Sequence, residues 1–226
     1  TPLIMYWILF IVIAIASWAV NAVLNHRFEK YAQVGLRLTG REVAEKMLRD
    51  NGITDVTVTC VPGHLTDHFD PRNKTVNLSE GVYRSASVAA AAVAAHECGH
   101  ALQHAFGYAP LRMRSALVPA VSFASKWMTW VLLAGILLIN IFPHLLTIGV
   151  ILYALTTLFA FVTLPVEVDA SRRATTWLSG AVITTYQTHP AAVSALRSAA
   201  YTYVVAALSS LEKLLYYVMI YLKRRD

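Results

Sequence analysis

Residues 3–20 form an apolar run, LIMYWILFIVIAIASWAV, that contains no Asp, Glu, Lys or Arg. Crossing the hydrocarbon core of a bilayer takes roughly 20 consecutive apolar residues in a helix. The run is therefore predicted to span a membrane. No basic stretch precedes it and no small-residue cleavage site follows it. We therefore expect residues 1–24 to be a retained transmembrane anchor rather than a cleaved signal peptide.

Two further apolar runs, residues 117–142 and 145–166, are separated only by a Pro-His pair. Helices joined by so short a turn must lie side by side, so the pattern predicts an antiparallel transmembrane hairpin over 117–166. The second run carries no charge, whereas the first contains Lys126. That lysine is expected either to extend its ammonium group to the membrane interface or to face the helix bundle.

The last apolar run covers residues 199–222 and is interrupted by Glu212 and Lys213. Adjacent opposite charges are costly inside a span unless they face protein or water. The C-terminal segment, residues 199–226, is therefore expected to face the bundle or to lie partly in the interface. Together the four runs predict a multi-pass integral membrane protein.

Basic residues set the expected orientation, because Lys and Arg next to spans collect on the cytoplasmic side. Those beside the first three spans would share one side; they are Arg27, Lys30, Arg112, Arg114, Arg172 and Arg173. We therefore expect the polar region to face the cytoplasm at a bacterial inner (plasma) membrane. With four spans, however, the basic C-terminal residues 223–225 would lie on the non-cytoplasmic side. That placement does not follow the preference of Lys and Arg for the cytoplasmic side.

Composition agrees with a membrane protein. Of the 226 residues, 57% are hydrophobic and 14% are charged. The net charge of +6 comes from scattered Lys and Arg that mostly flank membrane segments. It therefore indicates a juxtamembrane role rather than nucleic-acid binding. Cys60 and Cys98 are the only cysteines, too few for a disulfide framework.

The polar region, residues 25–116, is predicted to contain both helices and strands. Thr39 and Glu42 fit a capping box, and Ser87 fits an N-cap. Alternating side chains and a turn rich in Asp, Pro and Asn indicate the strands. The expected elements are a helix over 41–50, a strand over 55–61, a strand, turn and strand over 69–79, and a helix over 87–106.

The helix over 87–106 contains the sequence His-Glu-Cys-Gly-His. Residues four apart share a helix face, so His96 and His100 can direct imidazole nitrogens at one metal ion. Glu97 is about 100° around the helix from His96, which suits a general base acting on zinc-activated water. Cys98 faces away and is expected to be a buried thiol. The alternative is a pair of surface histidines on an Ala-rich helix.

Catalytic zinc needs a third protein ligand, which the fold must bring near. Glu167 is the leading candidate, because it follows the third span and so returns to the side of the membrane that holds the histidines. Its alternative role is an interfacial carboxylate paired with Arg172 or Arg173. The remaining candidates are Asp169, His189 and His104.

The chain resembles the bacterial YugP-like neutral zinc metallopeptidases in four motifs that follow one another over nearly its whole length. They are LTDHFDPR (65–72), HECGHALQ (96–103), LPVEVDASRRA (164–174) and AAYTYV (199–204). The combination is much more specific than the zinc motif alone. The resemblance implies a membrane gluzincin akin to HtpX-like peptidases.

For the fold, the resemblance implies a mainly α integral membrane protein. It would combine a zincin-like catalytic region, a small β-hairpin or sheet and about four transmembrane helices. The implied zinc ligands are His96, His100 and Glu167, with Glu97 as general base. Residues 167–198 would then form the helix and loop of the third ligand.

The implied activity is that of a membrane zinc metalloendopeptidase acting on peptide or protein substrates, in membrane-protein quality control. The chief alternative is a membrane scaffold or adaptor that keeps an unused zinc site. A metal transporter is disfavoured because the two hairpin runs offer only Lys126. A site-2-type protease is disfavoured because no later Asn-Gly or Asp-Gly motif exists. A membrane-protein partner or an oligomer stays open.

Several residues are candidates for supporting roles. The strand over 74–78 is expected to offer its edge to an extended substrate. Asp169 or Ser171 is expected to orient a ligand histidine, while His64 and His68 are expected to serve the preceding loop. Candidate donors to the oxyanion are Tyr203, Arg197 and His189.

Overall fold

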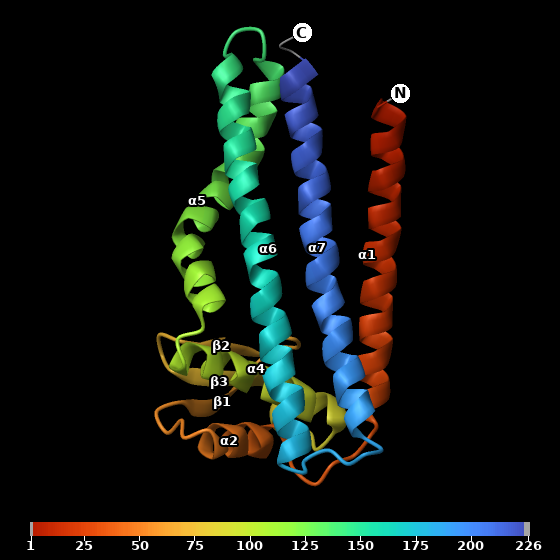
Figure 1. The fold of residues 1–226 in the computed structure, drawn as a ribbon, viewed down its shortest axis with the longest axis vertical. Coiled ribbons are helices and arrows are strands. Elements are labelled where there is room, and N and C mark those ends of the chain that lie inside the picture. The colour runs from red at the N-terminus through yellow and green to blue at the C-terminus, as the bar shows by residue number, and fades with distance from the viewer. Residues whose placement is uncertain (1, 224–226) are drawn as a thin grey trace. The chain divides into compact units, whose positions relative to one another are not determined.

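The computed structural model describes residues 2–223 and is mainly helical (Figure 1). In chain order the elements are α1 (Pro2–Ala32), α2 (Gly40–Asp50), β1 (Thr57–Val61), β2 (His68–Asp70), β3 (Thr75–Ser79), α3 (Glu80–Tyr83), α4 (Val88–Ala105), α5 (Ala109–Leu137), α6 (Pro143–Gly180) and α7 (His189–Lys223). Among the described helices, α1, α5, α6 and α7 are long and apolar enough to cross a membrane. The predicted fold class is confirmed. Of the basic C-terminal residues, Arg224 and Arg225 lie outside the described part of the chain.

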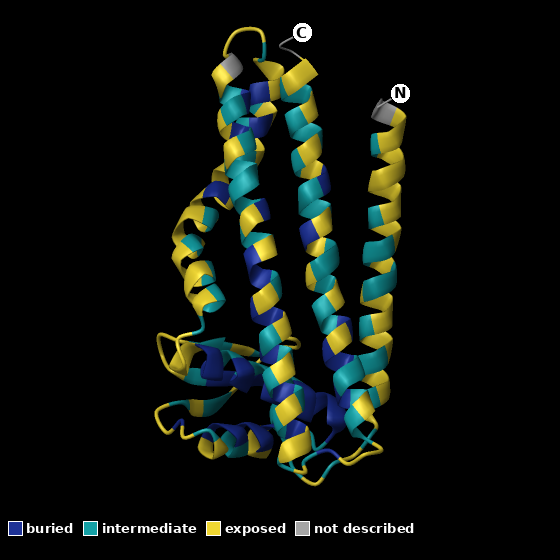
Figure 2. Cartoon of the chain, in the orientation of Figure 1, coloured by how far each residue is buried: buried dark blue, intermediate teal, exposed yellow. Residues whose placement is uncertain are grey.

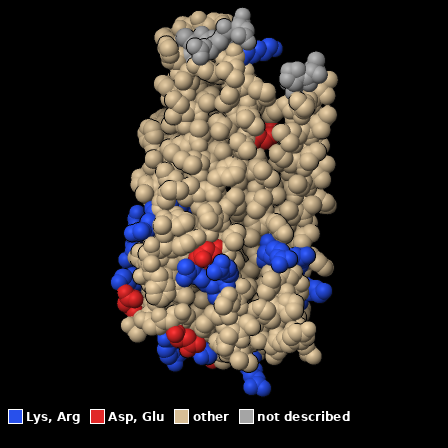
Figure 3. Space-filling view, viewed as in Figure 1, with Lys and Arg blue, Asp and Glu red and all other residues tan. Residues whose placement is uncertain are grey.

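The chain divides into two units, each of which is described by itself. The helical unit consists of Thr1–Ala19, Arg112–Leu164 and Tyr203–Asp226, and the α/β unit of Val20–Leu111 and Pro165–Thr202. Figure 3 shows few charged side chains over the helices of the helical unit, whereas Lys and Arg gather over the α/β unit. The chain thus leaves the α/β unit after α4 and re-enters it partway along α6.

Helices α5 and α6 pack closely at two glycines, and the contact at Gly135 is with backbone. A Cβ added at Gly135 of α5 would lie 2.7 Å from the Cα of Leu146, and one at Gly149 of α6 would lie 2.7 Å from a methyl carbon of Leu132. Small residues of this kind let membrane helices approach closely. Figure 1 shows the two helices side by side and running in opposite directions. Helix α5, however, ends at Leu137, before its apolar run does, and the chain turns there.

The charged residues within the apolar runs face different surroundings. Lys126 is exposed on α5, with its ammonium nitrogen 5.8 Å from the ring centre of Trp127, so it does not face the bundle. Glu212 of α7 is only 2% exposed, whereas its neighbour Lys213 is exposed. Helix α7 therefore turns its carboxylate toward protein, as expected for a span that faces a bundle.

The α/β unit contains a three-stranded sheet with the order β1-β3-β2. Strand β1 runs parallel to β3, with Thr57 opposite Thr75. Strand β2 runs antiparallel to β3, with His68 opposite Asn77. The expectation that residues 74–78 offer a free edge to substrate is therefore wrong. Strand β3 is central, and neighbours on both sides already use its backbone groups, so only β1 and β2 have free edges.

Local sequence signals predicted the ends of these elements to within one or two residues. Thr39 caps α2 with the predicted capping box. The Thr39 hydroxyl oxygen accepts a hydrogen bond from the Glu42 amide, and the Glu42 carboxylate accepts one from the Thr39 amide. The Ser87 hydroxyl oxygen accepts a hydrogen bond from the Ala90 amide at the start of α4. In the turn between β2 and β3 the Asp70 carboxylate accepts hydrogen bonds from two backbone amides that follow it. The predicted helices and strands of the polar region are confirmed, with ends shifted by one or two residues.

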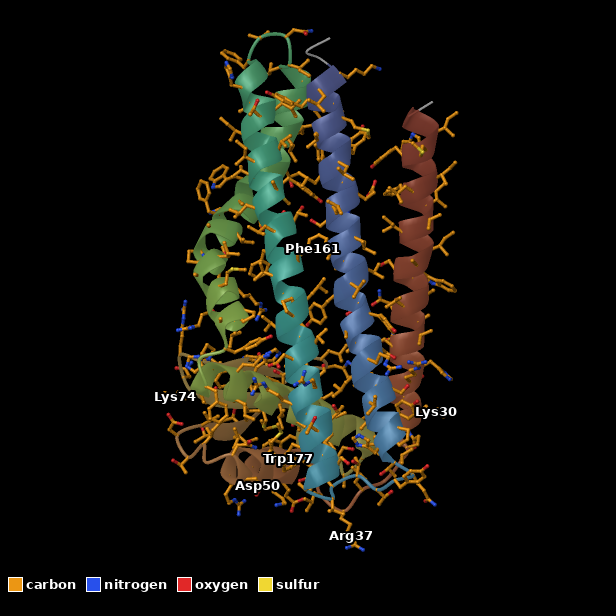
Figure 4. All side chains as sticks on the ribbon, viewed as in Figure 1. Lys30, Arg37, Asp50, Lys74, Phe161 and Trp177 are labelled. Carbon is orange, nitrogen blue, oxygen red and sulfur yellow. The ribbon has the colours of Figure 1, made fainter. Side chains whose placement is uncertain are left out.

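Helix α4 lies in the core of the α/β unit, and Figure 2 shows most of it buried. Its alanines carry so little side chain that neighbouring elements can cover it on several sides. The largest side chains packed in this core include Met47, Leu78 and Leu178, all fully buried. The indole nitrogen of Trp177 donates to the Asp50 carboxylate at 3.2 Å (Figure 4), which joins the end of α2 to α6. The core thus holds α4 firmly against α2, the sheet and the later part of α6.

Candidate metal centre

Three side chains of the α/β unit converge on one point. His96 and His100 come from α4, and Glu167 comes from α6. Nε2 of His96 lies 3.2 Å from Oε2 of Glu167, and Nε2 of His100 lies 3.6 Å from the same oxygen. The two imidazole rings stand edge to face, with centres 4.8 Å apart. Among the described residues, this is the group of His, Cys, Asp and Glu whose ligand atoms could hold a metal ion.

The two distances to the Glu167 oxygen match the spacing of donor atoms around a tetrahedral zinc ion. At ligand distances of about 2.1 Å, the corners of a tetrahedron lie roughly 3.4 Å apart. The two distances to the Glu167 oxygen are 3.2 and 3.6 Å, and all three donor atoms lie within 4.8 Å of one another. Two imidazole nitrogens and one carboxylate oxygen are also a donor set that zinc favours, with a fourth position left for a reactant.

Close packing of α4 on α6 brings the third group to the histidines. A Cβ added at Gly99 would lie 2.6 Å from the Ala170 carbonyl oxygen, so only glycine allows this approach. Gly99 lies one residue before His100, and Ala170 lies three residues after Glu167. The contact therefore sets the separation between the two halves of the site. Glu167 does not begin a helix of its own, because α6 runs on through Pro165 from the membrane hairpin.

Burial separates this cluster from ordinary surface groups. Glu167 is 4% exposed, and the side chains of His96 and His100 are partly covered, at 14% and 12% exposed. Burial by itself lowers the pKa of His100, but the hydrogen bond to Glu167 and the charges of Glu97 and Glu167 outweigh it, so the pKa of His100 is raised. A metal ion at this position competes with that proton.

Glu97 lies beside the cluster without joining it. Its carboxylate makes no hydrogen bond or ion pair to any residue in the described part of the chain, yet its charge helps to raise the pKa of His100. A carboxylate that is near the histidines but unpaired is available to accept a proton. The role of general base stays a prediction for Glu97.

Each of the two histidines also has a partner for its second ring nitrogen. Nδ1 of His96 lies 3.1 Å from the Ser171 hydroxyl oxygen, where a partner was predicted. Nδ1 of His100 lies 3.0 Å from Oε1 of Gln103. Asp169 touches neither histidine, but it accepts a hydrogen bond from the Gln103 amide. Gln103 was not among the predicted residues, although a polar residue one turn beyond His100 on a buried helix is a usable signal.

The other candidate residues lie elsewhere. The Cys98 thiol is fully buried, 3.6 Å from the Ala44 carbonyl oxygen, and burial raises its pKa, as expected for a thiol that is not a ligand. His68 contacts the Thr66 carbonyl and the Asn77 amide, in agreement with a role in the loop. His104 is exposed and packs near Phe69.

The three candidate oxyanion donors stay predictions. Nδ1 of His189 lies 2.9 Å from the Thr184 hydroxyl oxygen at the start of α7. Arg197 is exposed on the same helix. Tyr203 belongs to the helical unit, whereas the cluster belongs to the α/β unit.

Replacing Gly99 by Val is expected to lower the free energy of unfolding by about 1–3 kcal/mol, the usual cost of overpacking, or more. The clash is with backbone, so a side chain cannot simply turn away, and α6 must move from α4. Thermal unfolding in detergent measures the effect. Gly81→Val is the matched control, because a Cβ at Gly81 has no atom within 4 Å. Equal melting temperatures for both variants would show that the close approach does not hold the site together.

Comparison with known proteins gives two matches. A family model described as "Putative neutral zinc metallopeptidase" matches residues 6–222. The chain is also 42% identical over 225 residues to "Putative membrane protease YugP" of Bacillus subtilis (strain 168). That alignment covers 96% of this chain and 99% of the relative. No solved structure matches the chain.

Proposed function

We propose, on the premise that this chain belongs to the neutral zinc metallopeptidase family, that it is a membrane-embedded zinc endopeptidase. Membership confirms the resemblance drawn from the four sequence motifs. The observation that carries the proposal is the convergence of His96, His100 and Glu167, whose donor atoms lie within 4.8 Å of one another. These three residues are the proposed zinc ligands, and Glu97 is the proposed general base.

Zinc held by these ligands would lower the pKa of a water molecule and polarise the carbonyl of a peptide bond. Glu97 takes the proton of the attacking water, because its carboxylate is beside the ligands and unpaired. The same carboxylate then returns the proton to the leaving amine nitrogen, so that each turnover restores the base. Ser171 and Gln103 hold the imidazole rings of His96 and His100 in place.

The catalytic region is proposed to combine two stretches of the chain that flank the hairpin, residues 25–116 and 167–198. Support comes from the α/β unit, which contains most of both. The anchor (1–24), the hairpin (117–166) and the C-terminal segment (199–226) are proposed to span the membrane. Helices α1, α5, α6 and α7 have the length and hydropathy that this requires.

The proposed location is a bacterial plasma membrane, with the catalytic side facing the cytoplasm. The basic residues beside the first three spans support this orientation. The proposed substrates are peptides and unfolded or damaged membrane proteins, as in quality control. A scaffold with an unused zinc site is the outcome that the next experiment separates from this activity.

A chelator is expected to remove all peptide hydrolysis by the purified protein, and added Zn²⁺ is expected to restore it. The three proposed ligands form the one candidate metal centre among the described residues, and zinc would supply its Lewis acidity. Release of dye from a labelled unfolded protein in detergent measures the rate, and bound zinc is measured in parallel. A protein that binds zinc but cleaves neither unfolded nor membrane-inserted substrates would instead be a scaffold.

A further inference from the structure

We propose that Gln103 is a positioning residue that fixes the tautomer and direction of His100, through a relay that ends at Asp169 and Arg173. The inference rests on the proposed zinc site, because it concerns one of the three ligands. Gln103 is fully buried in the core of the α/β unit, where a polar amide is stable only if its donors and acceptor are satisfied.

The surroundings of Gln103 leave one orientation for its amide. Nε2 lies 2.8 Å from the Val166 carbonyl oxygen and 2.9 Å from Oδ2 of Asp169. A carbonyl and a carboxylate can only accept, so both must face the NH₂ group, which has two hydrogens to give. The amide oxygen is thereby directed to the remaining neighbour, Nδ1 of His100, at 3.0 Å.

This orientation determines which nitrogen of His100 carries the hydrogen. An amide oxygen cannot donate, so Nδ1 of His100 must be the donor in the contact with Gln103. In the neutral ring Nε2 then has a free lone pair, and Nε2 is the nitrogen that faces Glu167. In the neutral ring the relay therefore places the hydrogen on Nδ1 and leaves Nε2, the nitrogen aimed at the site, free to bind a metal.

The far end of the relay is fixed by charge. Nε of Arg173 donates to the same Asp169 oxygen at 2.6 Å, one helical turn along α6. The Arg173 guanidinium lies 5.7 Å from the ring centre of Tyr108, and the Tyr108 hydroxyl donates to the Pro165 carbonyl oxygen at 3.5 Å. These contacts hold the Asp169 carboxylate, which in turn holds the amide of Gln103. The chain of contacts runs from the half-buried Arg173 inward to the ligand.

His96 has no equivalent device. Its Nδ1 faces the Ser171 hydroxyl at 3.1 Å, and a hydroxyl can donate as well as accept. Ser171 therefore permits the metal-binding tautomer of His96 without enforcing it. Ser171→Ala is therefore the matched comparison for a substitution of Gln103. Each of the two substitutions removes the partner of one proposed ligand histidine.

Gln103→Met is expected to weaken zinc binding about 10–100-fold, the usual effect of losing such a partner. Methionine matches the length of Gln but offers His100 no strong acceptor. The apparent dissociation constant is measured in detergent by competition with a chromophoric chelator, and the visible spectrum of the Co²⁺-loaded protein is recorded. Ser171→Ala is expected to produce a smaller change, and Asp169→Asn an intermediate one.

Zinc affinity and a Co²⁺ spectrum equal to those of the wild type in Gln103→Met would overturn the inference. An effect of Ser171→Ala as large as that of Gln103→Met would do the same. Gln103→Leu repeats the test with a second apolar side chain, and circular dichroism identifies the variants that fold. If the wild-type protein binds no zinc, the proposed function itself fails. If the wild type binds zinc and Gln103→Met binds it equally well, only the inference about Gln103 fails.

Discussion

Glu97→Gln is expected to abolish peptide hydrolysis while leaving zinc bound. The change keeps the size of the side chain but removes its ability to take a proton, and general bases typically contribute about 10²–10⁴-fold to the rate. Zinc should stay, because the proposed ligands are His96, His100 and Glu167, and Glu97 makes no hydrogen bond or ion pair that holds them. Initial rates and bound metal are measured on the same preparation.

Glu80→Gln is the matched control for this prediction. Glu80 belongs to the same unit, but it is exposed on α3, and its nearest ion-pair partner is Arg84 at 3.8 Å. The control should hydrolyse peptide at the wild-type rate. Hydrolysis by Glu97→Gln at that same rate would contradict the mechanism, and loss of zinc from Glu97→Gln would make Glu97 a ligand instead of a base.

Features that depend on neighbours in sequence were predictable from the chain alone. The four candidate spans of the described chain were identified from apolar runs long enough to cross a bilayer. Such runs predict helices because lipid leaves the backbone few alternatives to a helix. The caps at Thr39 and Ser87 followed from one or two side chains. The alignment of His96 with His100 followed from the helical repeat.

Features that depend on packing between distant segments were not predictable in this way. An alternating pattern of apolar and polar residues identifies a strand but not the strands beside it. For this reason β3 was wrongly predicted to be an edge strand, although β1 and β2 flank it. The role of Gln103 depends on Val166 and Asp169, which lie more than sixty residues away. These contacts form where α4 packs on α6 at Gly99, and no local sequence pattern predicts that packing.

The placement of Glu167 depends both on the local sequence and on packing between distant segments. Its position after a hairpin that returns to its starting side was visible in the sequence, and this made it the leading candidate for the third ligand. Its separation from the histidines depends on helix packing, which places its oxygen 3.2 and 3.6 Å from the two ring nitrogens. The family match supports a zinc enzyme without naming its ligands. A direct test of Glu167 is therefore the decisive one for the site.

Glu167→Ala is expected to lose zinc and, with it, all hydrolysis. Removing a ligand leaves two imidazoles, which is fewer than the three protein ligands of catalytic zinc sites, so the affinity should fall by more than the roughly 10–100-fold typical of a lost supporting contact. Glu167→Gln fills the same space with a neutral group and should also bind weakly. Zinc per chain is measured after dialysis against a fixed free-zinc buffer.

Glu45→Ala serves as the control, because Glu45 is a carboxylate of the same unit whose ion-pair partner is the exposed Arg41. It should keep a full complement of zinc. Retention of zinc by Glu167→Ala would move the third ligand to Asp169, His189 or His104. The structure makes that result unexpected: Asp169 is engaged by Gln103 and Arg173, His189 contacts Thr184, and His104 is exposed. Loss of zinc from Glu167→Ala but not from Glu45→Ala would show that α4 and α6 both contribute ligands to one metal centre.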